Sequence, residues 1–358
     1  MRYLLLVLIC INLFANAKNS FKVLQPSSKT VFYEDFVSVV VKIPKESKAT
    51  HLVIKSNGKK HIHNIKNDRA TYCKTVKLNF GKNLIFITLY NENKILKKSS
   101  LNIFHRSEVF NNAVDIPKGY KKKYFHINKN EKSCKKCHDM TIDKVNNSKS
   151  LSNIDLKNIG IVNMANISNV KILENTSDSK CYSCHKSVIS KSNSHAPSVN
   201  FACLQCHTGE TNFFNKEYEG KSRFLAPDPI DIKCMNCHDK VDKSWYKKDS
   251  QHGPVMTGRC TKCHNPHSSN NEFFLRKPIW KLCTTCHSEK AKGKHVLTSF
   301  VFSRNKGAHP TKGRQDPVRP GRELVCSGCH NPHGSDGIHL LRTTGKTAYS
   351  VCKRCHEK

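Results

Sequence analysis

The chain has little apolar material for its length. Only 37% of its 358 residues are hydrophobic, and 8% are aromatic. A chain of this size and polarity cannot bury a large core made of its own side chains. Either part of it is disordered, or another component supplies an apolar interior. The 18 cysteines favour the second explanation.

Long hydrophobic runs are missing after the first few residues. Arg2, the apolar stretch Leu4–Phe14 and Ala15-Asn16-Ala17 have the pattern of a signal peptide, residues 1–17, cleaved before Lys18. Cys10 lies inside that stretch and is expected to be removed with it. No later run reaches the roughly 18 residues that span a bilayer. We therefore predict Sec-dependent export to the periplasm or the cell exterior, with no transmembrane segment in the mature protein.

The cysteines have one dominant spacing. Sixteen of them fall in eight copies of C-x-x-C-H, the attachment signature of c-type haem: two thiols bind the vinyl groups of one porphyrin, and the following histidine binds iron. The predicted attachment cysteines are Cys134, Cys137, Cys181, Cys184, Cys203, Cys206, Cys234, Cys237, Cys260, Cys263, Cys283, Cys286, Cys326, Cys329, Cys352 and Cys355. The predicted proximal iron ligands are His138, His185, His207, His238, His264, His287, His330 and His356. Disulfides or zinc ribbons would leave the histidine after every pair unexplained. The predicted cofactor is heme c with its iron, in eight copies.

The supply of further histidines nearly matches the demand for second axial ligands. Of the 20 histidines, eight are proximal, and His51, His61 and His63 lie far from the motifs in sequence. The distal candidates are the remaining nine: His126, His195, His252, His267, His295, His309, His333, His105 and His339. An iron between two imidazoles has no place for a substrate. The C-x-x-C-K motif found in several multihaem enzymes is also absent, so no catalytic residue is predicted.

A repeat organises the motifs. His126, His195 and His252 each stand eight residues before the first cysteine of a motif, and His309 precedes Cys326 with a longer insertion. This spacing predicts four two-haem modules, about 126–194, 195–251, 252–308 and 309–358.

The last two modules share a further pattern. His264-Asn-Pro-His267 and His330-Asn-Pro-His333 match, whereas Thr141 and Glu210 replace the last histidine in the first two modules. Alignment of module four on module three places His339 where Phe273 stands. His339 is therefore a candidate for the one histidine in excess of the eight distal ligand positions.

The segment H-x-P followed by C-x-x-C-H-x-P-H resembles the doubled-CXXCH multihaem c-type cytochromes. The resemblance covers about residues 120–358 and is strongest in the last two modules. It implies a chain of closely spaced haems, stacked and T-shaped in alternation. For residues 107–358 we therefore expect an octahaem cytochrome domain of short helices and loops whose interior is filled by the porphyrins.

Residues 18–106 carry no haem motif. Short alternating apolar segments at 37–41, 52–54, 76–78 and 84–89 are separated by turn signals such as Asn57-Gly58. This pattern predicts an all-β, antiparallel sandwich, and the Gly81-Lys-Asn83 turn resembles bacterial Ig-like domains. We expect Cys73 to be a small buried residue of a strand, and the domain to serve docking or assembly. Residues 141–180 are read as a polar loop within module one.

Three functions remain open. The favoured one is an electron carrier that links redox partners: a quinol-oxidising membrane cytochrome, a terminal reductase or an outer-membrane conduit. A subunit of an extracellular cytochrome filament is the alternative, and a multihaem reductase of nitrogen or sulfur compounds is the third. The net charge of +34 favours acidic redox partners, anionic lipid or cell-surface polymers over nucleic acid, which an exported haem protein rarely meets.

Overall fold

The computed structural model divides the chain into two compact units, Met1–Met140 and Thr141–Lys358. It describes residues 19–66, 68–109, 116–132, 134–135, 138, 140, 180–209, 224–292, 295, 309–343 and 347–356. The predicted signal peptide, Cys137 and nearly all of the polar segment 141–180 lie outside the described residues. Within the described residues, no helix has the length and apolarity that a bilayer crossing needs.

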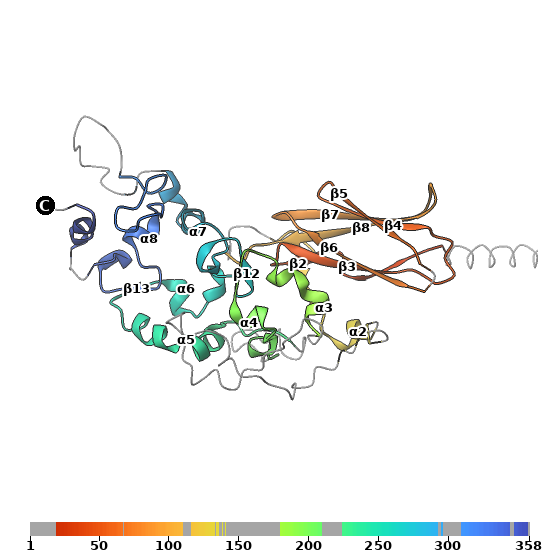
Figure 1. Cartoon of the computed structure of the whole chain (residues 1–358), viewed down its shortest axis with the longest axis horizontal. Helices are drawn as coiled ribbons and strands as arrows, with labels where there is room; N and C mark the ends of the chain where they lie inside the picture. Colours follow the sequence, from red (N-terminus) through yellow and green to blue (C-terminus); the bar gives the residue numbers. More distant parts are fainter. Residues whose placement is uncertain are drawn as a thin grey trace, which may run out of the picture. The chain divides into compact units, whose positions relative to one another are not determined.

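Two β-sheets form the first unit (Figure 1). The smaller sheet has the order β1 (Lys22–Gln25), β3 (Phe36–Lys42) and β6 (Thr71–Lys77). The larger has the order β5 (Lys59–Asn64), β4 (His51–Ser56), β7 (Gly81–Asn91), β8 (Lys94–His105), β2 (Thr30–Phe32) and β9 (Lys121–Lys122). Most pairs are antiparallel, as expected, but β2 runs parallel to β8 and to β9. The larger sheet therefore includes residues beyond position 106, where the sequence placed the end of the β domain. The domain boundaries themselves stay predictions.

One apolar core joins the two sheets. Every second residue of β3 is buried, at Val37, Val39 and Val41, and the same alternation buries Ile85 and Ile87 of β7. These side chains belong to a single cluster. The period-2 pattern thus produces a β-rich unit with its own core, and its membership of the Ig-like class stays a prediction.

The strand register corrects one expectation. Tyr72 of β6 points into the core and is 3% exposed, so the next residue, Cys73, faces outward and is exposed. The expectation of a buried Cys73 was wrong. It rested on the apolar character of cysteine, whereas successive side chains of a strand point to opposite faces, and Tyr72 occupies the inner face.

The two main turn signals are confirmed. Asn57 and Gly58 both have positive φ, +49° and +76°, and link β4 to β5 as a two-residue hairpin loop requires. Asn83 is 4% exposed and its amide donates to the carbonyls of Asn79 (2.7 Å) and Gly81 (3.0 Å), which fixes the turn between β6 and β7.

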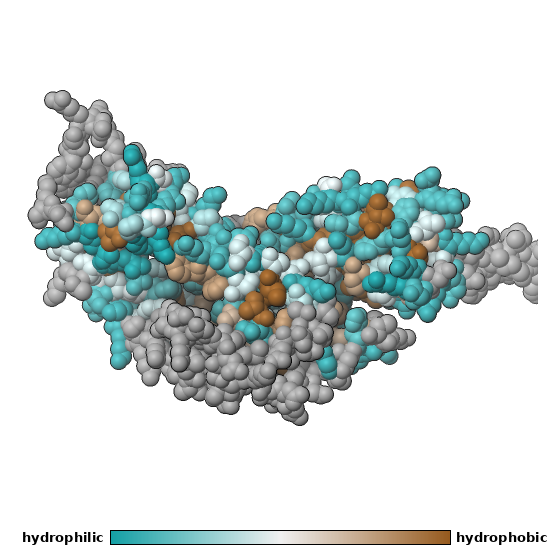
Figure 2. Space-filling model, viewed as in Figure 1, coloured by the Kyte–Doolittle hydropathy of each residue, from teal (hydrophilic) through white to brown (hydrophobic). Residues whose placement is uncertain are grey.

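The described elements of the second unit are short, except for α5, which has 15 residues and a kink at His238. Its helices, with one from the end of the first unit, are α2 (Asn128–Glu131), α3 (Tyr182–His185), η5 (Lys186–Ile189), α4 (Ala196–Val199), η6 (Cys203–Gln205), α5 (Asp231–Trp245), α6 (Gly253–Met256), η8 (Cys260–Lys262), η9 (Glu272–Phe274), α7 (Ile279–Cys286), η10 (Ser288–Lys292), α8 (Cys326–Cys329), η11 (Ile338–Leu340) and η12 (Ala348–Arg354). Among the described residues, 20 buried apolar residues precede position 110 and only six follow it. The surface in Figure 2 is mostly hydrophilic, with small separate hydrophobic patches. The second unit therefore has no side-chain core comparable to that of the first, as the low apolar content predicts.

Neighbouring modules are joined by a repeated two-stranded ladder. β10 (Asn193–Ser194) pairs with β12 (Ser268–Ser269), and β11 (Ser250–Gln251) pairs with β13 (Gly334–Ser335). In both cases the first strand directly precedes the leading histidine of one module. The second strand directly follows the His-Asn-Pro-His segment of the next module. Modules three and four therefore each hold the start of the preceding module against their own first motif.

Candidate functional site

Each described C-x-x-C-H motif occupies one helical turn. The backbone N–H of the proximal histidine donates to the carbonyl of the first cysteine, as in His207 to Cys203 (2.9 Å) and His264 to Cys260 (3.0 Å). The same bond is present in His138, His185, His287, His330 and His356, and the motif of His238 lies inside α5. One turn places both thiols and the imidazole on the same side of the backbone, which is the arrangement that attachment to one porphyrin requires.

Six proximal histidines face a second histidine at nearly constant separation. The ring centroids are 5.8 to 6.4 Å apart in all six pairs. The pairs, with the proximal residue first, are His207–His267, His238–His195, His264–His333, His287–His252, His330–His295 and His356–His309. Every second member is one of the nine distal candidates. The partners of His138 and His185 stay predictions.

This separation fits a metal atom between the rings. With metal–nitrogen bonds of about 2 Å and roughly 1.1 Å from nitrogen to ring centre, two imidazoles on opposite sides of one iron have centroids about 6 Å apart. Direct stacking of nearly parallel rings gives shorter distances in the same chain: His51 stacks on Tyr90 at 4.7 Å, and Trp245 on His333 at 4.2 Å. The five nearly parallel histidine pairs are therefore further apart than directly stacked rings. The residues present therefore fit iron held between paired imidazoles.

Hydrogen bonds orient the rings through Nδ1. The carbonyl of Pro266 accepts from Nδ1 of His195 at 3.0 Å, and the carbonyl of Phe273 accepts from Nδ1 of His264 at 2.7 Å. Phe224 and His339 provide the same backbone acceptor to His207 and His330. A proton fixed on Nδ1 leaves the Nε2 lone pair for a metal. Sequence reasoning missed these carbonyl acceptors, because any residue can supply a backbone carbonyl.

Partial burial favours the neutral form of three distal imidazoles. It lowers the pKa of His195 to about 4, that of His267 to about 3 and that of His333 to about 4, with neighbouring histidines adding to the effect. These groups are uncharged near pH 7, and the neutral imidazole is the form that binds metals.

The attachment thiols of successive motifs lie against one another. Between modules, the first cysteines of adjacent motifs are hydrogen-bonded: Cys181 with Cys203, Cys234 with Cys260, and Cys283 with Cys326. Within modules two, three and four, the second cysteines interact: Cys206 with Cys237, Cys263 with Cys286, and Cys329 with Cys355. Burial raises the pKa of Cys206, Cys263 and Cys329. Hydrogen-bonded first cysteines and electrostatically interacting second cysteines thus alternate from the second motif to the eighth.

The remaining distal candidates have different surroundings. His339 is exposed and has φ +52°, as Phe273 has φ +55° at the same place of module three. His105 ends β8 with its ring edge-on to Phe80 at 6.2 Å, and Nδ1 of His126 is 3.2 Å from the Glu131 carboxylate.

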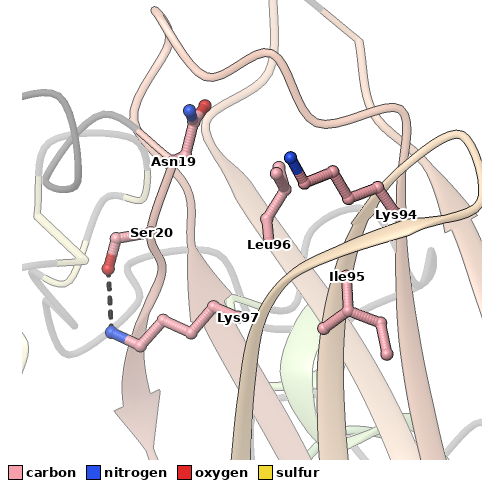
Figure 3. A pocket seen from close by; sticks show the side chains of 6 residues that line it. All are labelled: Asn19, Ser20, Lys94, Ile95, Leu96 and Lys97. Atoms are coloured by element: carbon pink, nitrogen blue, oxygen red, sulfur yellow. Dashed lines mark hydrogen bonds between the residues drawn. The ribbon is translucent and has the colours of Figure 1, made fainter.

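The β unit contains a pocket whose lining includes neither histidine nor cysteine (Figure 3). Its lining consists of Asn19, Ser20, Lys94, Ile95, Leu96 and Lys97. Nζ of Lys97 donates to the Ser20 hydroxyl at 2.8 Å and to the Phe21 carbonyl at 3.1 Å. Lys97 thus holds the first described residues against β8, which is a structural role.

Comparison with known proteins agrees with the motif geometry. The family model described as "Doubled CXXCH motif" matches residues 252–292 and 316–358. The chain is 30% identical over 171 residues to "Multiheme cytochrome MtrA" of Shewanella baltica (strain OS185), which covers 46% of this chain and 44% of that protein. The chain thus spans less than half the length of this relative.

Two solved structures show weak likeness. An FMN-binding beta-glucuronidase from Facaelibacterium prausnitzii L2-6 has a TM-score of 0.19 at 13% identity and covers 24% of this chain and 12% of its own. The fibronectin(III)-like modules of Clostridium thermocellum CbhA have a TM-score of 0.21 at 15% identity and cover 27% and 50%. Scores this low carry no argument about the fold.

The motif turns and the paired imidazoles fit covalently attached haem. The chain carries the doubled CXXCH motif over residues 252–292 and 316–358 and is similar to multihaem c-type cytochromes.

Proposed function

We propose that this chain is an exported octahaem c-type cytochrome that passes electrons along a line of bis-histidine haems. The haems would be held by the eight C-x-x-C-H motifs, and the protein would act between redox partners in the periplasm or at the cell surface. Haem c, when bound, supplies the reversible Fe(III)/Fe(II) couple. The protein's own residues attach it, ligate it and hold it in order.

The observation that carries this proposal is the set of six imidazole pairs. An iron bound on both sides by imidazoles is six-coordinate, so it exchanges electrons without binding a substrate. The Nδ1 hydrogen bonds to carbonyls prevent ring rotation and keep the donor atom facing inward. This arrangement favours an electron carrier over an enzyme.

The alternating thiol contacts support a line of haems in sequence order. Each thiol is bonded to a porphyrin edge in the mature cytochrome, so motifs whose thiols touch hold neighbouring porphyrins. The first cysteines are in contact between modules, and the second cysteines interact electrostatically within one module. Two alternating kinds of contact agree with the alternating stacked and T-shaped pairs that the family resemblance implies.

Charge supports acidic partners. The polypeptide carries a formal charge of +34. Each haem with its propionates contributes about −1 to −2, so eight haems leave a strongly basic surface. Such a surface speeds encounters with acidic redox proteins, and the rate falls as salt rises.

Haem quantitation with low-temperature EPR tests this function. The expected result is a mass increase of eight haems over the mature polypeptide and low-spin ferric signals only. A stoichiometric high-spin iron in the native protein, with turnover of a nitrogen or sulfur compound, would contradict the carrier role.

A filament subunit is the second candidate function, favoured by His339. This imidazole is exposed in the last module, whereas the repeat supplies Glu210 in place of a ligand for the iron of His138. A histidine of one copy could therefore complete a haem of the next. Light scattering after size exclusion distinguishes the two: a monomer whose irons are all low-spin excludes ligand sharing between copies.

A further inference from the structure

A buried carboxylate contacts the leading histidine of module one. Glu131 ends α2 and is 0% exposed. Its Oε1 lies 3.2 Å from Nδ1 of His126. A carboxylate with no exposure is costly unless charged or polar partners compensate it, so this contact is a built feature of the fold.

The leading histidines of the other modules have neutral acceptors instead. Nδ1 of His195 donates to the carbonyl of Pro266 at 3.0 Å, and His252 donates likewise to the carbonyl of Pro332. Nδ1 of His309 is 3.0 Å from the carbonyl of Pro310. Only module one, among these four, places a carboxylate at this nitrogen.

The sequence accounts for the difference. The proline carbonyl comes from the His-Asn-Pro-His segment of the following module. Module two has Thr208-Gly209 where modules three and four have Asn-Pro, and the Gly209 N–H is bonded to Leu225. Glu131 stands three residues before the first cysteine, a place where Asn200 and Thr257 bond to backbone carbonyls of their own helices. Module one thus supplies the acceptor from within itself.

We propose that Glu131 is a tuning and positioning residue for the haem that His126 ligates, and that it makes this haem the one of lowest reduction potential among those with leading-histidine ligands. The inference rests on the proposed function in one respect, that His126 is an axial ligand.

The physical reason is charge. A hydrogen bond from Nδ1–H to a carboxylate is charge-assisted and makes the imidazole a stronger donor than a bond to a carbonyl does. The ferric state carries one more positive charge than the ferrous state, so a stronger donor and a nearby buried negative charge both stabilise it. Both effects lower the potential at which this iron is reduced.

The test is a spectroelectrochemical titration of the holoprotein with three variants. Glu131→Gln keeps the side-chain shape and an acceptor oxygen but removes the charge. Glu323→Gln is the matched control, because Glu323 occupies the same place in module four, is exposed and accepts from the Gly313 N–H. His126→Met checks ligation, since methionine in place of histidine raises the potential of a ligated iron. Haem content by mass confirms that each variant is assembled.

The expected result for Glu131→Gln is a positive shift of one haem at the low-potential end, with an altered low-spin EPR signal for that haem alone. Glu323→Gln should superimpose on the wild type. If His126→Met shifts one haem but Glu131→Gln leaves the titration unchanged, the tuning role is refuted and the ligand assignment stands. If His126→Met changes neither the titration nor the EPR spectrum, His126 is not a ligand, and both the inference and that part of the proposed function are overturned.

Discussion

Replacing His309 by alanine should remove an EPR signal that differs from those of the other paired haems. The ring planes of His309 and His356 are 76° apart, whereas the other five pairs are 8° to 24° apart. The angle between the imidazole planes of a six-coordinate iron decides how the two iron d orbitals that overlap with the rings are split.

The direction of the effect follows from symmetry. Two parallel rings raise the same d orbital, so their effects add and the splitting is large. Two nearly perpendicular rings raise different orbitals, so their effects largely cancel. A small splitting leaves more orbital angular momentum and moves the largest g value upward. The net splitting scales with the cosine of the angle between the ring planes, so it falls to about a quarter of the parallel value for His309–His356, whereas at 24° and below about nine tenths or more remains.

Low-temperature EPR of the fully oxidised protein provides the measurement. Of the six described pairs, one should give a highly anisotropic low-spin signal in the wild type, and that signal should integrate to one haem. His309→Ala should abolish it and produce one high-spin iron. His252→Ala is the control, since its pair with His287 has a 24° angle and its loss should reduce the ordinary signals only. Loss of an ordinary signal in His309→Ala, with the anisotropic signal intact, would refute the reasoning.

Three further outcomes are expected. His339→Ala should leave all low-spin signals of the monomer unchanged, because its ring is exposed; a new high-spin signal would contradict this. Asn83→Ala should lower the free energy of unfolding of the β unit by about 1–3 kcal/mol, because two backbone carbonyls lose their buried donor, as denaturant titration by circular dichroism can measure. Asp316 is 2% exposed and Arg319 bonds to it at 2.6 Å, which with backbone N–H donors lowers its pKa below 3.8. The folded state therefore gains stability above pH 3.8 that is lost as pH falls through the lowered pKa. Asp316→Asn should lower the free energy of unfolding by about 2 kcal/mol at pH 7, and it should weaken the decrease of that free energy at acidic pH.

The chemistry could be predicted from sequence because it is local. Two cysteines and a histidine within five residues occupy one helical turn whatever surrounds them, and eight repetitions leave no other explanation. Distal ligands differ, because they are set by long-range contacts. His195 is paired with the second motif of its own module, whereas His267 is paired with the first motif of the preceding module. Spacing gave no sign of this, since the ladders that impose it are only two residues long.

In the β unit, too, local features could be predicted from the sequence, whereas long-range pairing could not. Alternating apolar residues predicted β3, β4 and β7, and Asn57-Gly58 predicted the hairpin between β4 and β5. The parallel pairing of β2 could not be read from three residues, because Thr30, Val31 and Phe32 have the same pattern in either direction. The exposure of Cys73 could have been found by counting the alternation outward from Tyr72.

In the last module, a count of histidines could not predict which one is the distal ligand. The nine distal candidates exceed the eight distal ligand positions by one. Both His295 and His339 lie next to the same proximal residue, His330. The His339 carbonyl accepts from Nδ1 of His330 at 2.7 Å, and its left-handed backbone conformation goes with an exposed side chain. The ring of His295 faces that of His330 at 5.8 Å. The first motifs of modules two and three take their distal histidines from the module that follows. The first motif of module four is instead paired with His295, which belongs to the preceding module and has no counterpart in the repeat, so no repeat-based alignment would select it.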